Sequence, residues 1–140
     1  MADLNPLLRL NKFRLEEKQR ALSKLYAEVE SLEIQKKAIL DSVESEKNVV
    51  DHDTGNFMLM QSFMNYFQRS KNEIETINNQ ISTFDIKINR MVDEMRTAFG
   101  EFKKIEITRN RRLDDIQKEN QKREDALFSE IALEIYRRSE

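Results

Sequence analysis

Large apolar side chains recur every seven residues through the first third of the chain. A second apolar series follows three residues behind the first, which is the a and d pattern of a helix that packs along one seam. Polar residues interrupt the pattern at Lys36 and Glu46. The two series predict a helix from about residue 6 to 49, with seam positions Leu8, Leu15, Leu22, Val29, Lys36, Val43 and Val50 and, three later, Asn11, Lys18, Leu25, Leu32, Ile39 and Glu46.

The second pattern is denser than the first. It predicts a helix from about residue 57 to 137, about 120 Å long at 1.5 Å per residue. Thirteen of its fourteen seam positions are apolar, and Ser70 is the exception. The a series is Met60, Phe67, Ile74, Ile81, Ile88, Met95 and Phe102, and the d series is Phe63, Ser70, Ile77, Phe84, Met91, Ala98 and Ile105.

Residues that break helices are rare and well placed. The chain has two Gly and one Pro, so it makes few turns. Asn5-Pro6 is a start signal, because Asn caps helices and Pro is tolerated at the first helical position. The run from Asp51 to Asn56 predicts a turn at about 50–56, with Asp53, Thr54 or Asn56 as the cap of the second helix. The fold class is therefore all-α, a single elongated antiparallel coiled-coil hairpin over residues 1–140.

In an antiparallel pair of helices, the numbers of facing residues add up to a constant. A sum of 106 is preferred, because it sets Lys36 opposite Ser70, the polar interruptions of the two seams. This register also pairs Leu15 with Met91 and Leu22 with Phe84. A sum of 113 keeps the heptads in phase too, but it loses the polar match. With a sum of 106, the second helix projects beyond the first as an overhang from about residue 106 to 140.

The stretch GNFMLMQSFMNYF, residues 55–67, is too rich in apolar residues for one seam. Met60, Phe63 and Phe67 are assigned to the seam. The surplus side chains either thicken the flanks of the seam or form a docking surface, since exposed apolar patches mark interaction sites and Met adapts to many partners. The candidate docking residues at this tip are Phe57, Met58, Leu59, Met64 and Tyr66.

The overhang is polar at first and becomes apolar again from residue 126. A basic cluster lies just after the predicted end of the hairpin, and it is either a solvated segment balanced by Asp114 and Asp115 or a binding site for acidic loops. The apolar stretch has no partner elsewhere in the chain. The candidate partner-binding residues of this end are Arg109, Arg111, Arg112, Leu127, Phe128, Ile131, Ile135 and Tyr136.

Composition argues against catalysis and against membrane insertion. Charged residues make up 36% of the chain, the mean hydropathy is -0.74, and no apolar run approaches the ~20 residues of a membrane span. The N-terminus does not have the pattern of a secretory signal. A two-helix hairpin offers no concave pocket for a substrate. We therefore expect no catalytic residue, no cofactor and no metal. His52, the only histidine, stands in a turn between Asp51 and Asp53.

A net charge of -2 and the absence of cysteine bear on partners and compartment. The charge balance gives no general attraction to nucleic acid. The lack of thiols fits a reducing compartment, and we expect a cytoplasmic protein.

The two ends of the chain resemble the FliJ family of flagellar type III export proteins and their injectisome counterparts. The resemblance lies in LNPLLRLNKFRLEEKQRAL at residues 4–22 and in RRLDDIQKENQKREDALFSEIALEIYRR at residues 111–138, together with the length and the central turn. The family often has Asp-Glu before its Ile-Ala; this chain has Ser129-Glu130.

The resemblance implies a stalk that is similar to the central stalk of rotary ATPases. Such a stalk would insert into the hexamer of the export ATPase FliI and contact the export gate FlhA and export chaperones. It would bind no small-molecule substrate and would associate with the inner membrane only through these partners. Two alternatives remain open from the residues alone. One is a generic coiled-coil adaptor or homodimer that pairs through residues 131–136 and the Met-rich tip, and the other is a nucleic-acid-binding coiled coil that uses the arginines.

Overall fold

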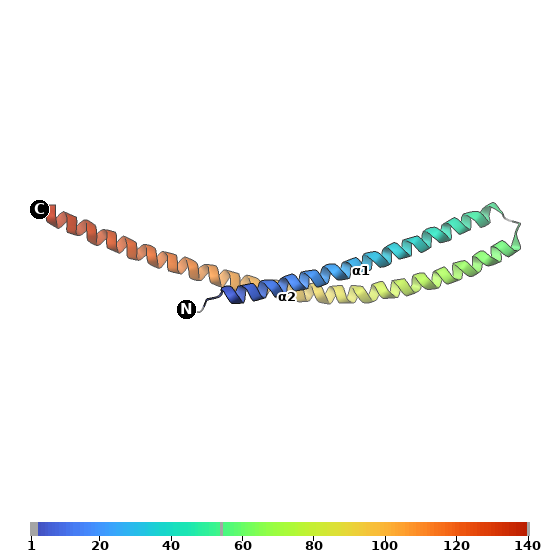
Figure 1. Cartoon of the computed structure of the whole chain (residues 1–140), viewed down its shortest axis with the longest axis horizontal. Helices are drawn as coiled ribbons and strands as arrows, with labels where there is room; N and C mark the ends of the chain where they lie inside the picture. Colours follow the sequence, from blue (N-terminus) through green and yellow to red (C-terminus); the bar gives the residue numbers. More distant parts are fainter. Residues whose placement is uncertain (1–2, 54, 140) are drawn as a thin grey trace. The chain divides into compact units, whose positions relative to one another are not determined.

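The computed structural model describes residues 3–53 and 55–139, and in these ranges the chain forms two helices and no strand. Helix α1 spans Asn5–His52 and helix α2 spans Phe57–Ser139. The predicted all-α hairpin, with a second helix longer than the first, is confirmed (Figure 1). The predicted helix bounds lie within three residues of the observed ones.

The chain divides into two compact units. One unit, Glu16–Arg96, holds most of α1, the turn and the first half of α2. Within it, α1 and α2 are antiparallel, and the Lys18 Nζ donates a hydrogen bond of 2.8 Å to Glu94 Oε2. The other unit is Met1–Leu15 with Thr97–Glu140. Within it, the start of α1 packs on α2, and Arg109 Nη1 donates to Asn5 Oδ1 at 3.1 Å.

Asp3 and Asn56 accept the hydrogen bonds at the starts of the helices. The prediction that Asn5 caps α1 is wrong, because Asn5 is the first helical residue and its backbone N–H donates to Asp3 Oδ1 at 3.0 Å. This frees the Asn5 side chain to bind Arg109. At the start of α2, the Leu59 N–H donates to Asn56 Oδ1 at 3.1 Å, which identifies Asn56 as the cap among the three candidates. Thr54 lies outside the described residues.

The seam of α1 is the one that the heptads predict. Every predicted a and d position from Leu8 to Val50 is buried or half-buried, apart from the exposed Glu46. On α2 the predicted positions from Ser70 to Ile105 are buried or half-buried as well. The most buried apolar residues are Leu15, Val50, Ile77 and Ile88, each 6–8% exposed. No described side chain is less than 2% exposed, because a helix in a two-stranded pair is covered on one face only.

The preferred register, with paired numbers summing to 106, is wrong. Lys18 and Glu94 sum to 112, and Asn5 and Arg109 sum to 114, so each unit separately supports the alternative sum of 113. A sum of 106 would set Lys18 opposite Ile88, six residues or about 9 Å from Glu94. Ser70 is buried beside Ala38, Ile39 and Ser42 rather than opposite Lys36.

The corrected register shortens the overhang. Asn5 reaches Arg109, and Arg109 and Arg112 are both half-buried. From Leu113 to Ser139 every described residue is exposed. The overhang therefore begins at Leu113 and not at residue 106, because α1 covers seven more residues of α2 than the register of 106 allows.

We predict that the buried seam carries the stability of the hairpin. Ile88→Ala removes a buried side chain and leaves a cavity, so the free energy of unfolding should fall by about 2–4 kcal/mol. Ile86 is 63% exposed on the same helix, and Ile86→Ala should change the free energy by less than ~0.5 kcal/mol. Urea denaturation followed by circular dichroism measures both. Equal losses in the two variants would contradict the placement of the seam.

The Lys18–Glu94 ion pair predicts a pH dependence. The hydrogen bond and the positive charge of Lys18 hold the pKa of the Glu94 carboxyl below its ordinary value. A carboxyl whose folded pKa is depressed stabilises the fold above the unfolded pKa, and this contribution is lost as the pH falls through the folded pKa. The stability advantage of the natural chain over Glu94→Gln should therefore hold at pH 7 and shrink below the ordinary glutamate pKa of about 4.3.

Thermal melts of both chains across this pH range make the measurement. Glu101→Gln, at an exposed carboxylate of the same helix, is the control and should show no such convergence with the natural chain. A stability difference for Glu94→Gln that stays constant down to pH 2 would rule out the pair as its source.

Candidate functional site

The tip of the hairpin carries an apolar stripe on the outside of α2. Phe57, Met60, Met64 and Phe67 are 75%, 47%, 57% and 42% exposed. Their spacing of three, four and three residues places them on one face of the helix. We call these four residues the tip stripe. The ring of Phe67 contacts the half-buried ring of Phe63, with 6.1 Å between centroids, so one end of the stripe is held by a seam residue.

The assignment of tip residues from the sequence needs correction. Met60 and Phe67, which the heptads place in the seam, are exposed, whereas Leu59 and Tyr66 are half-buried. The covered positions from Leu59 to Ser70 are 59, 63, 66 and 70. They advance eleven residues in three turns, or 3.67 residues per turn, instead of the 3.5 of a heptad. The seam thus drifts around α2 near the turn, and this exposes the two residues that a strict heptad would bury.

Three of the five tip candidates are surface residues. Phe57 and Met64 belong to the tip stripe. Met58 is 80% exposed but lies about 100° around the helix from Phe57, so it faces another direction. Tyr66 lines a groove with Ile39, Ser42 and Ser70, where the small side chains leave space between the helices.

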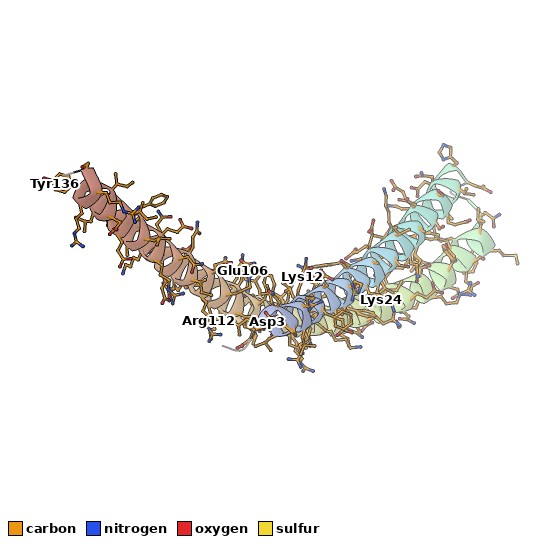
Figure 2. The ribbon with its side chains drawn as sticks, turned by 60° about the vertical axis from the view of Figure 1, so that its left-hand side comes forward. Asp3, Lys12, Lys24, Glu106, Arg112 and Tyr136 are labelled. Atoms are coloured by element: carbon orange, nitrogen blue, oxygen red, sulfur yellow. The ribbon has the colours of Figure 1, made fainter. Side chains whose placement is uncertain are left out.

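The arginine cluster is split between two environments. Arg109 and Arg112 line a groove of about 200 Å³ against Leu4 at the start of α1, with Asp3, Leu113 and Ile116 nearby. Figure 2 labels Asp3 at the start of α1 and Arg112 on α2 at this end of the hairpin. Arg109 Nε is buried, and no hydrogen-bond partner stands within reach in the described part of the chain. Arg111 is exposed outside this groove. The three arginines therefore do not form one cationic surface.

The C-terminal part of α2 presents an apolar face that no described residue covers. Leu127, Phe128, Ile131 and Ile135 are 46–69% exposed, and their spacing places them within about 100° of one another around the helix. We call these four residues the C-terminal face. Tyr136, which the sequence groups with them, lies on the other side together with Leu133. Figure 2 shows Tyr136 near the end of α2.

Ion pairs between side chains of α2 stabilise this exposed segment. Arg123 donates to Glu119 at 3.0 Å, and Arg138 lies 3.3 Å from Glu134. Exposed pairs at this spacing contribute a few tenths of a kcal/mol each. The charges thus keep the helix solvated, while the C-terminal face stays available to another molecule.

Sequence reasoning missed four residues of these surfaces. Met60 and Phe67 could have been found from the eleven-residue spacing of Leu59 and Ser70, which competes with the heptad. Asp3 and Leu4 precede the Pro6 start signal, and only the corrected register places them against Arg109 and Arg112.

Comparisons with protein-family models, with curated proteins and with solved structures found no match for this chain. Within the described residues, neither helix contains a stretch of 18 residues that is apolar enough to span a membrane. No group of three or more His, Asp or Glu side chains in residues 3–53 and 55–139 is arranged to hold a metal ion.

Tyr66 and Met58 are both tip candidates from the sequence, but only Tyr66 is half-buried, so we predict that their loss changes the free energy of unfolding by different amounts. Tyr66→Ala should lower the free energy of unfolding by about 1–2 kcal/mol, because its ring is partly covered by α1. Met58→Ala should leave the unfolding curve unchanged within ~0.5 kcal/mol. Chemical denaturation of the two variants tests this, and a Met58 loss as large as that of Tyr66 would count against the observed burial.

Proposed function

We propose that this chain is a non-enzymatic stalk and regulatory subunit of a flagellar type III protein export ATPase. In this proposal one end of the chain inserts into the FliI hexamer, and the tip contacts the export gate FlhA. Export chaperones are further partners. The chain would work in the cytoplasm and would lie at the inner membrane through these partners alone.

The observation that carries the proposal is the uncovered part of α2. All described residues from Leu113 to Ser139 are exposed, and the C-terminal face concentrates four large apolar side chains on one side. Exposed apolar patches of this kind mark interaction sites. A helix that extends beyond its own hairpin suits insertion into a ring, where the ring would supply the missing cover.

The charges next to this segment suit the same partner. Arg111 is exposed, and the groove with Arg109 and Arg112 is open at the end of α1. Acidic loops of a ring would find the exposed guanidinium group of Arg111 on a helix rather than on a mobile loop, which lowers the entropy lost on binding. The identity of the ring as an export ATPase is supported by the resemblance of residues 4–22 and 111–138.

The proposal predicts a gain of ATPase activity. Purified full-length chain, added to the export ATPase of the same organism, should raise its rate of ATP hydrolysis and promote ring formation, as measured by phosphate release and by electron microscopy. Ile131→Asp should raise the concentration for half-maximal stimulation at least ~10-fold, because a charge would be buried at the centre of the contact.

Leu133→Asp is the matched control. Leu133 is 56% exposed two residues away on the opposite side of the helix, so this variant should stimulate the ATPase like the natural chain. If the natural chain has no effect on the ATPase, the proposed function is wrong. If both variants lose stimulation equally, the C-terminal face is not the contact.

A further inference from the structure

We propose that the tip stripe pairs with the tip stripe of a second copy of this chain, in a weak antiparallel dimer. The inference does not rest on the ATPase proposal. It concerns Phe57, Met60, Met64 and Phe67, which lie at the other end of α2 from the C-terminal face.

The order of residues in the tip stripe is the same in both directions. It reads Phe, Met, Met, Phe with spacings of three, four and three, so the numbers of residues that are equally far from its centre sum to 124. A two-fold axis beside the centre of the stripe therefore brings Phe57 of one copy against Phe67 of the other, and Met60 against Met64. An interface between two identical chains requires such self-complementarity.

Charge at the edges of the tip stripe fits the same arrangement. No Asp, Glu, Lys or Arg lies between Asp53 and Arg69, in a chain that is 36% charged, so two stripes meet without repulsion or buried charge. The exposed Lys71 lies one turn beyond Phe67 on α2, and the exposed Asp53 lies in the connection before α2, where its carbonyl accepts from Asn56 N–H. An antiparallel pairing therefore brings the Lys71 end of one stripe to the Asp53 end of the other, where the charges are opposite in sign. A parallel pairing would instead bring like charges to the same end.

The area indicates a reversible dimer. The exposed fractions of the four side chains correspond to roughly 400–500 Å² per copy, if each side chain offers about 200 Å². The total of about 800–1,000 Å² is below the roughly 1,200–2,000 Å² of stable interfaces. We therefore expect dimers at about 100 µM chain and mostly monomers at about 1 µM.

Sedimentation velocity of the full chain over this concentration range tests the proposal. Met64→Glu should weaken the association at least ~10-fold, because it sets a carboxylate against the apolar Met60 of the other copy. Met58→Glu is the matched control. It introduces the same charge at a Met of the tip that is 80% exposed, against 57% for Met64, and lies off the stripe, and it should leave association unchanged. Circular dichroism confirms that both variants keep their helices.

Mixed variants test the direction of pairing. Met64→Glu mixed with Met60→Lys should associate again, because residues 64 and 60 of different copies face each other. Met64→Glu mixed with Met64→Lys should not associate.

Recovery in the second mixture alone would show a parallel pairing and overturn the proposal. The proposal would also be overturned if the natural chain stays monomeric up to about 1 mM. The same holds if Met64→Glu leaves the association intact, or if Met58→Glu weakens it as much as Met64→Glu does. ATPase stimulation enters none of these readouts, so failure here leaves the proposed function standing.

Discussion

The constraint on which the rest of the molecule depends is one apolar seam between two helices of unequal length. Helix α1 has 48 residues and α2 has 83, so α1 cannot cover all of its partner. The seam buries or half-buries an apolar side chain at each a and d position from Ile74 to Ile105 of α2, and its cover ends at Arg112. The length difference, rather than any special residue, leaves the described residues from Leu113 to Ser139 exposed.

The seam is also narrow, so side chains on its flanks stay partly exposed. Its most buried apolar residues keep 6–8% of their surface exposed, and polar residues occupy several seam positions. Asn11 is buried with its side chain donating to the Leu7 carbonyl at 2.9 Å, and the half-buried Lys18 donates to Glu94. Two helices have no third neighbour to cover their flanks. Large side chains such as Met64 therefore stay on the surface, where another chain can bury them.

Sequence alone predicted the helices and the seam of α1 well, because a heptad repeat with few breakers admits hardly any other structure. The pairing register of the two helices was harder to predict from the sequence. Matching Lys36 with Ser70 is a weak preference, since a half-exposed lysine reaches solvent by itself, and it is outweighed by two cross-helix contacts, at Lys18 and at Asn5. The same limit applies to the tip, where the heptad assigned Met60 and Phe67 to the seam although α2 drifts to a period of 3.67. The sequence therefore indicated the tip as a region of surplus apolar side chains, while which of them are exposed needed the structure.

The central claim, that α2 is covered by α1 only as far as Arg112, has a direct test in native-state hydrogen exchange of the monomeric chain at low concentration. Amides between Ser70 and Ala98 should exchange only through global unfolding, because seam packing holds them. Amides between Gln117 and Ser139 should exchange at least ~100-fold faster, since fraying needs no loss of tertiary contact. Equal protection of the two segments would contradict the account, because it would mean that the C-terminal segment packs against the chain's own surface.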